Sequence, residues 1–399
     1  MRESTAAFER REEAAPKPRR RRWPWIVAGV VVALIVVFHA AGGWYFAGLL
    51  RSDGFDPAGP QAYVDATAGP VTDDSITLIP VDDATEPGRE GLYGLKWKDG
   101  YGQIGAISAV VDAGIERSFE LLEGSAPSPG TEMDVMGWSW PSDPARAHGY
   151  VYETVQYDSE LGPMNAWLVP GTESTWAIFV HGKGVDLREG LRILPTLHEA
   201  GMPVMLINYR NDADQPQDPS GIYQYGQTEW RDLEGAVEFA TDAGAERVVL
   251  VGASTGGAVI SSFLLESDLA KSVDAVVLDS PNLDFGQVVD VEASERSLPG
   301  IGLPVPATLT WTAKTIAAVQ LGISWDDLDY VSRADEFEVP ILVIHGTNDG
   351  TVPIEISREL AKARPDLVTL VETDAGHVLS WNVGPAAYAD AIENFLGLT

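Results

Sequence analysis

The segment that most constrains the fold runs from Val248 to Val259. Four apolar β-forming residues lead into Gly252-Ala253-Ser254-Thr255-Gly256, and an apolar-faced helical pattern follows at once. This order predicts a strand, a sharp turn and a helix, with Ser254 at the turn. Small residues two positions before and after such a serine are needed, because larger side chains would collide there. The segment predicts a serine hydroxyl held out beyond a sheet edge, as a nucleophile requires; the alternative is a glycine-rich turn that only connects two elements.

A dinucleotide-binding site can also begin with a strand, a glycine-rich turn and a helix. Asp279 stands at the end of the next predicted strand, where a ribose-binding acid could lie. The sequence G-A-S-T-G-G nevertheless departs from the G-x-G-x-x-G spacing, and this strand is not the first of its domain. A phosphate loop of the Walker type is excluded because no lysine follows the glycines.

The N-terminal part of the chain predicts a membrane segment. Residues 1–22 form a basic tail that ends in four arginines, and residues 23–50 contain no charged side chain. About 20 apolar residues suffice to span a bilayer, and aromatic residues at both ends of the run resemble interfacial belts: Trp23, Trp25, Trp44 and Tyr45. The basic tail should stay cytoplasmic, which places the remaining chain outside. The alternative is a cleaved signal peptide, but the run is longer than a usual signal core and no convincing A-x-A site ends it.

Composition excludes several function classes. The 399 residues carry a formal net charge of −32, so phosphate contacts would be repulsive and nucleic acid is not an expected partner. The absence of cysteine excludes disulfides, thiolate catalysis and cysteine-based metal sites. With 45% hydrophobic and 22% charged residues, the chain is otherwise an ordinary globular one.

The rest of the chain divides into a linker, a β-rich module and an α/β domain. Residues 51–61 form a Gly/Pro/Asp-containing linker, expected to hold the two folded parts away from the membrane. Residues 62–160 read as short β segments at 76–80, 91–101, 106–122, 135–140 and 149–157. Their aromatic residues could line a binding surface, but core packing is the more usual role. From residue 161 to 399, strands alternate with helices, which predicts a mostly parallel sheet covered on both faces.

One connection in the α/β domain is unusually long. About sixty residues separate Asp279 from Pro340, and the stretch from Leu298 to Trp325 carries a single charge, Lys314. Long insertions of this kind often cap a pocket, so residues 284–335 are predicted to form a lid. The alternative is an extra helix pair packed on the body of the domain.

A serine nucleophile needs a base, and the six histidines can be sorted by context. His377 follows the last predicted strand, where a loop returns over the sheet edge, while the others lie in the apolar run, the β-rich module, a helix or tight strand ends. The loop after the preceding strand supplies Asp349 as the acid that orients the imidazole. Asp279 is a competing acid, and Asp374 is close in sequence but suits a turn cap.

An oxyanion formed by attack on a carbonyl needs backbone N–H donors already in place. The amide of Thr255 directly follows the nucleophile at the start of its helix. The second donor is expected from His181-Gly-Lys-Gly184, most simply the amide of Lys183. The Lys183 side chain is expected to be an ordinary surface group.

These motifs resemble those of the α/β-hydrolase superfamily. The similar elements are Ser254 in G-A-S-T-G, Asp349 in H-G-T-N-D-G-T-V-P, His377 in D-A-G-H and the earlier H-G-K-G, in the family's Ser–Asp–His order. The resemblance covers about residues 162–399. It implies a mostly parallel eight-stranded sheet, hydrolysis of esters or amides through an acyl-enzyme, and no cofactor. Ala253 and Thr255 depart from the commonest serine motif, so the motif does not identify the substrate.

We therefore expect a single-pass, membrane-anchored serine hydrolase of the esterase- or peptidase-like kind, with its catalytic domain outside the cytoplasm. The substrate is expected to be a small carboxylic ester, and the apolar lid favours acyl chains. No cofactor, metal or nucleic acid is expected. An amidase or peptidase, an acyltransferase with the same acyl-enzyme and a non-catalytic binding protein on the same fold are the alternatives.

Overall fold

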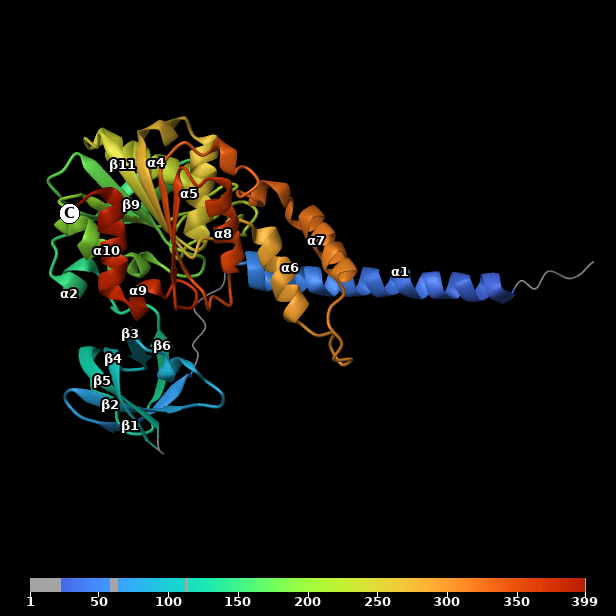
Figure 1. Ribbon diagram of the computed structural model, residues 1–399, viewed down its shortest axis with the longest axis horizontal. Helices are drawn as coiled ribbons and strands as arrows, with labels where there is room; N and C mark the ends of the chain where they lie inside the picture. Colours follow the sequence, from blue (N-terminus) through green and yellow to red (C-terminus); the bar gives the residue numbers. More distant parts are fainter. Residues whose placement is uncertain (1–22, 58–63, 112–113, 399) are drawn as a thin grey trace, which may run out of the picture.

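The computed structural model describes residues 23–57, 64–111 and 114–398 (Figure 1). The basic tail at 1–22 and part of the expected linker, from residue 58, lie outside the described residues. Figure 1 shows a long N-terminal helix, a small β-barrel and a larger α/β domain from which two helices project beside the N-terminal helix.

Helix α1 (Trp23–Leu49) continues as a short π-helical segment, η1 (Leu50–Phe55). Within the described ranges, this continuous helix alone is long and apolar enough to cross a membrane. Only 6% of its most apolar window is buried, unlike the core helix of a soluble protein. The helix therefore fits a membrane anchor or a signal sequence.

The beginning of the expected linker does not stand away from the α/β domain. Phe55 is fully buried, and its ring packs against Tyr225, Phe285 and Trp325 of that domain. Its carbonyl accepts a hydrogen bond of 2.8 Å from the amide of Tyr223. Residues 50–55 thus dock onto the domain, because burial of this aromatic ring offsets the ordering of the segment.

The β-rich module is a closed antiparallel barrel. Its strands are β1 (Ala66–Val71), β2 (Ser75–Pro80), β3 (Tyr93–Trp97), β4 (Gly100–Val111), β5 (Gly114–Gly124) and β6 (Glu132–Met136), in the order β1-β2-β5-β4-β3-β6, with the short helix η2 (Glu86–Gly88) between β2 and β3. The predicted segment 106–122 is two strands, since β4 and β5 form a long hairpin. Tyr93, Trp97 and Phe119 are buried inside, so these aromatic residues form core.

The α/β domain is built on an eight-stranded sheet in the order β14-β13-β12-β11-β9-β10-β8-β7. The strands are β7 (Glu153–Ser159), β8 (Gly162–Val169), β9 (Thr175–Val180), β10 (Val204–Ile207), β11 (Arg247–Ala253), β12 (Val273–Asp279), β13 (Ile341–Gly346) and β14 (Val368–Thr373). The six strands from β14 to β10 are parallel, and β8 and β7 complete the sheet by antiparallel pairing.

Strand β7 corrects the sequence-based division of the chain. The segment 149–157 was predicted in the β-rich module, but β7 pairs with β8 along its whole length. A tight turn at residues 160–161 joins the two strands, so hairpin formation places β7 on the edge of the α/β sheet.

Helices cover both faces of this sheet, as predicted. One face is covered by α4 (Trp230–Asp242), α5 (Thr255–Glu266) and α8 (Ile354–Ala363), and the other by η3 (Leu187–Arg192), α3 (Leu194–Glu199) and α10 (Pro385–Leu396). Short helices α2 (Pro144–His148), η4 (Asp268–Ser272) and α9 (Ser380–Val383) lie in connections. In α4, Leu233, Val237 and Ala240 recur at helical spacing, and all three are fully buried in the core.

The insertion between β12 and β13 contains α6 (Phe285–Glu295), α7 (Ala307–Leu321), η5 (Asp326–Leu328) and η6 (Ala334–Glu336). Helices α6 and α7 lie on the side of the domain from which α1 emerges (Figure 1). They occupy the range predicted as a lid.

Candidate active site

Ser254 occupies the sharp turn between β11 and α5. Its backbone has φ 49° and ψ −116°, a positive φ that a non-glycine residue rarely adopts. A Cβ on Gly256 would lie 2.1 Å from the Val180 carbonyl oxygen, and one on Gly252 would lie 2.7 Å from Ile260 Cδ1. Only glycine fits at both positions, which accounts for the spacing around the serine.

His377 lies in the loop after β14 and reaches Ser254. Its Nε2 is 2.9 Å from Ser254 Oγ, and its Nδ1 is 2.8 Å from Asp349 Oδ2. The next residue, Val378, has φ 54°, and its amide donates to Ser280 Oγ at 3.1 Å. A positive φ is strained for a β-branched residue, so surrounding contacts hold this loop in its conformation.

Asp349 follows β13 and is buried beneath the imidazole. Its Oδ1 accepts hydrogen bonds of 2.8 Å from the amides of Thr351 and Val352, and its Oδ2 accepts from His345 and His377. Burial raises the carboxyl pKa, but the hydrogen bonds from the two histidines outweigh it and hold the pKa of Asp349 well below its usual range. The carboxylate stays ionised and acts as an acceptor.

His345 supports Asp349, a role that the sequence analysis did not give it. Its Nε2 is 3.1 Å from both Asp349 Oδ2 and the Val352 carbonyl oxygen, and its Nδ1 is 2.7 Å from Ser357 Oγ. Two acceptors around Nε2 require the proton there, which leaves Nδ1 to accept from the serine hydroxyl. The sequence signal was its position at the end of β13, four residues before Asp349.

The competing acids lie elsewhere. Asp279, at the end of β12, accepts a hydrogen bond of 3.1 Å from the Tyr388 hydroxyl, and burial raises its pKa to about 6. Asp374 bonds the side-chain amide of Asn348. The structure brings Asp349 to His377, whereas the carboxyl groups of Asp279 and Asp374 bond other partners.

The loop after β9 adjoins the nucleophile. A Cβ built on Gly182 would lie 3.2 Å from Ser254 Cβ, and the Gly182 amide donates to Glu189 Oε2 at 2.8 Å. The next amide along this loop belongs to Lys183. Thr255 is buried at the first position of α5, where a helix has no partner of its own for its N–H groups. Both amides predicted to face an oxyanion thus belong to segments beside Ser254, and their roles stay a prediction.

His181 is a buried cation beneath this loop. Its Nδ1 is 2.8 Å from the Gly182 carbonyl oxygen, and its Nε2 is 2.9 Å from Asp212 Oδ2. Burial opposes the charge, but Asp212 outweighs it and raises the pKa of His181 to about 9. Two acceptors around the ring are both satisfied by the doubly protonated form.

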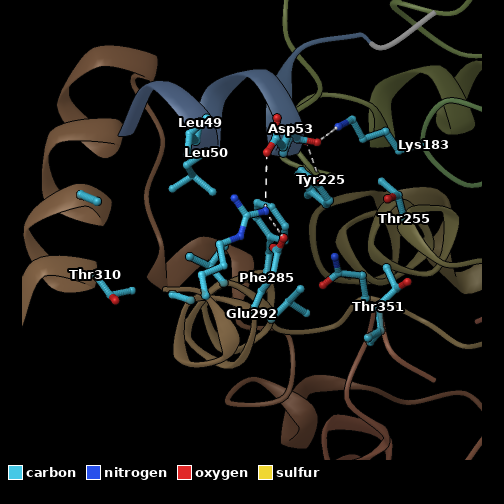
Figure 2. A pocket seen from close by; sticks show the side chains of 18 of the residues that line it. Leu49, Leu50, Asp53, Lys183, Tyr225, Thr255, Phe285, Glu292, Thr310 and Thr351 are labelled. Atoms are coloured by element: carbon cyan, nitrogen blue, oxygen red, sulfur yellow. Dashed lines mark hydrogen bonds and ion pairs between the residues drawn. The ribbon is translucent and has the colours of Figure 1, made fainter. Parts of the chain in front are cut away.

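Lys183 differs from the surface lysine expected from the sequence. Its Nζ donates a hydrogen bond of 2.7 Å to the backbone carbonyl of Asp53, at the end of η1 (Figure 2). Burial lowers the pKa of Lys183 to about 8. The lysine joins the active-site loop to the end of the N-terminal helix.

The side chains of Ser254 and His377 line a cavity of about 420 Å³. Its walls combine the end of α1 and η1 with α6, α7 and the loop after β13, and Figure 2 shows Leu49, Leu50, Phe285 and Thr310 around it. Four charged side chains also line it: Asp53, Lys183, Glu292 and Arg296. Such a concave, mainly apolar site with a few converging polar groups suits a small organic substrate. Among the described residues, no cluster of three or more His, Asp or Glu side chains could hold a metal ion.

A family model for the alpha/beta hydrolase family matches residues 137–391. The chain belongs to this family. Strand β7 lies within the matched range, in agreement with its place in the sheet. Residues before 137, including α1 and the barrel, lie outside the match. Family membership supports hydrolase activity in general.

Relatives and solved structures agree with this assignment. The uncharacterized protein YfhR of Escherichia coli O157:H7 is 22% identical over 215 residues, which cover 52% of this chain and 66% of that protein, just under two thirds. The alpha/beta hydrolase domain-containing protein WAV2 of Arabidopsis thaliana is 25% identical over 261 residues, 63% of this chain and 80% of WAV2. The Pyrococcus furiosus esterase Pf2001 superposes with a TM-score of 0.51 at 19% identity, covering 65% of this chain and 96% of the esterase. The last similarity shows the fold.

Proposed function

We propose that this protein is a membrane-anchored serine hydrolase that cleaves carboxylic esters with Ser254, His377 and Asp349. The supporting observation is the unbroken hydrogen-bonded chain from Ser254 Oγ through the His377 ring to Asp349, in which Ser254 and His377 line the cavity. A hydroxyl, an imidazole and a buried carboxylate in this order are the parts that acyl transfer needs.

In the first half of the reaction, Ser254 Oγ forms a bond to the ester carbonyl carbon while its proton passes to His377 Nε2. The carbonyl oxygen becomes an oxyanion. The bond from carbon to the alcohol oxygen then breaks, and His377 returns the proton to the leaving alcohol, which leaves an acyl-serine. In the second half, His377 takes a proton from water as its oxygen attacks the acyl carbon. The bond between Ser254 Oγ and the acyl carbon then breaks, His377 returns the proton to Oγ, and the carboxylic acid leaves.

Three features favour the charged groups that form during the reaction, the oxyanion and the imidazolium. The amides of Lys183 and Thr255 are assigned to the oxyanion, because they follow Gly182 and Ser254 in the two segments that meet at the nucleophile. The positive charge of His181 lies directly beneath the first of these segments. Asp349 holds the proton of His377 on Nδ1 and stabilises the imidazolium, which forms while the serine proton is in transit.

A retained anchor is supported over a cleaved signal sequence by the packing of the helix end. Phe55 is buried in the α/β domain, and Phe46, Leu49 and Leu50 form part of the cavity wall. Removal of α1 would open that wall. With α1 across a membrane, the arginines at residues 19–22 favour a cytoplasmic N-terminus and an extracytoplasmic α/β domain.

Labelling with a fluorophosphonate, which phosphonylates activated serines, tests the proposal. The full chain in detergent should be labelled, Ser254→Ala should not, and its ester turnover should fall by about 10³-fold or more. Ser272→Ala is the matched control, since that hydroxyl bonds the Leu269 carbonyl in η4, away from the cavity. Labelling that persists in Ser254→Ala would place the nucleophile elsewhere, and an unlabelled wild type would favour a non-catalytic binding protein. Parallel assays with aminoacyl amides and with an added alcohol acceptor distinguish an amidase and an acyltransferase from an esterase.

A further inference from the structure

Helix α7 packs along the last third of α1 (Figure 1). His39 Nε2, inside the apolar run, lies 3.0 Å from Thr308 Oγ1 at the beginning of α7. A Cβ on Gly43 would lie 2.7 Å from Thr312 Cγ2, so glycine in α1 permits this close approach. The lid therefore lies beside a part of α1 that a membrane would enclose.

An ion pair marks the level at which α1 and the lid both pass from charged sequence into uncharged sequence. Arg296, at the end of α6, lies 3.5 Å from the carboxylate of Asp53, just past the end of α1. From this ion pair, α1 runs back without a charge through residues 23–50, and the lid runs forward without a charge through residues 297–313. Lys314, the next charge of the lid, is paired with Asp290 at 2.9 Å. The two uncharged segments extend from the same level and lie side by side.

The uncharged part of the lid exposes large apolar side chains. Ile301 is 63%, Leu303 60% and Trp311 69% exposed, and we refer to these three residues as the lid tip. Large apolar side chains exposed along one segment of a soluble surface mark a contact with a partner or a membrane. The lid tip lies beside α1, which favours a membrane over a protein partner as its contact. A segment without charges can enter a membrane because it avoids the large desolvation cost of charged groups.

The cavity links this region to the nucleophile. Phe46 and Leu49 of α1, Val289 of α6 and Ala313 of α7 line the cavity. Figure 2 shows Leu49 and Thr310 on the side of the cavity away from Thr255, the residue that follows Ser254. This side of the cavity thus lies among α1, α6 and α7. The lid tip belongs to α7 and to the segment that joins α6 to α7. An acyl chain leaving the bilayer between these helices would meet mainly apolar walls on its way to Ser254. The lining also includes four charged side chains, of which Asp53 and Arg296 are paired with each other: Asp53, Lys183, Glu292 and Arg296.

We propose that the lid tip lies in the membrane leaflet on the side of the α/β domain, and that the substrate is a long-chain acyl ester taken directly from that leaflet. The acyl chain lies between α1, α6 and α7, and the ester group reaches Ser254. This proposal rests on the proposed serine ester hydrolysis and assigns its substrate class. The alternative is a water-soluble ester that enters from the aqueous side.

The depth of the lid tip can be measured with single cysteines, since the chain contains none. Full-length Ile301→Cys and Trp311→Cys are labelled with an environment-sensitive dye and reconstituted into phosphatidylcholine vesicles. Val151→Cys is the control: it is 79% exposed and follows α2, on the opposite side of the molecule from α1 (Figure 1). Lipids brominated along the acyl chain should quench the dye at 301 and 311 but not at 151. Equal quenching by aqueous iodide at all three positions would overturn the proposal.

Substrate entry is tested with a matched pair of esters. Methylumbelliferyl oleate dissolved in the vesicles is the membrane substrate, and methylumbelliferyl acetate is the soluble one. Ile301→Glu and Trp311→Glu should lower oleate turnover about tenfold or more, because a carboxylate resists insertion, and should leave acetate turnover within twofold. Val151→Glu should change neither. Equal effects on both esters, or no effect on oleate, would contradict entry from the leaflet. Fluorophosphonate labelling of the same variants shows whether each variant is folded and retains a reactive serine. If the wild type itself is not labelled, the proposed function fails, rather than entry from the leaflet.

Discussion

The ring of His345 donates its Nε2 proton to the carboxylate of Asp349 at 3.1 Å, on the oxygen that also accepts from the proposed base. The carboxylate of the proposed triad is therefore held by a second histidine, from the end of the preceding strand β13. Both side chains are fully buried. This contact fixes the carboxylate in the direction of the base and favours its ionised form.

Replacement of His345 by Phe should separate this support from catalysis itself. The ring remains, but Asp349 loses a donor, and Ser357 and the Val352 carbonyl lose a partner. We expect a loss of about 1–3 kcal/mol in the free energy of unfolding and about a tenfold fall in kcat. Because the carboxyl pKa rises when a donor is lost, activity should also be lost at a higher pH on acidification than in the wild type. A pH profile of unchanged position would mean that the amides of Thr351 and Val352 suffice.

Asp349→Asn should remove most activity, whereas Asp279→Asn should not. The amide that replaces Asp349 cannot stabilise the imidazolium and favours the wrong tautomer, and kcat should fall about 10³–10⁴-fold. Asp279 instead bonds Tyr388, so its replacement should lower kcat less than tenfold. Steady-state kinetics on a soluble ester measure both. The opposite ranking of the two variants would make Asp279 the orienting acid.

The lowered pKa of Lys183 predicts that the contribution of this residue to stability increases with pH. Burial lowers its pKa from 10.5 to about 8, so between these values the unfolded chain still binds the proton that the folded protein has released. Stability contributed by this group therefore rises with pH over that window and is lowest below pH 8, where the charge is buried in the folded state. The Tm of wild type minus that of Lys183→Met should increase from pH 8 to pH 10. Parallel curves would indicate that the lysine is solvated.

Strand order made the positions of the three proposed catalytic residues predictable from the sequence. Ser254, Asp349 and His377 each come directly after a strand, and parallel strands bring their carboxyl ends to one sheet edge. The alternation of strands and helices was predictable as well, because hydrophobic periodicity is a local property. Strand β7 was assigned to the wrong sheet, since alternation predicts a strand but not its partner.

Contacts between distant segments could not be predicted in this way. The bond from Lys183 to Asp53 joins residues 130 positions apart, and no motif marks it. The face of α1 that packs on the lid could not be predicted either, because apolar residues surround the axis of this helix almost uniformly. His39 was the one polar group inside it, and its partner Thr308 lies in a separate part of the chain.

Phe55→Ala should uncouple the N-terminal helix from the α/β domain. The ring is fully buried, with centroids 5.2 Å from Phe285 and 5.6 Å from Tyr225, and truncation of such a side chain costs about 3–5 kcal/mol. Because Phe55 belongs to the end of the helix rather than to the sheet, we expect part of this loss to appear as local release of η1. Limited proteolysis between residues 50 and 65 should accelerate severalfold more than global unfolding does. Val110→Ala, at an exposed barrel position, should change neither rate. If cleavage and global unfolding of Phe55→Ala accelerate together, the helix end and the domain unfold as one unit.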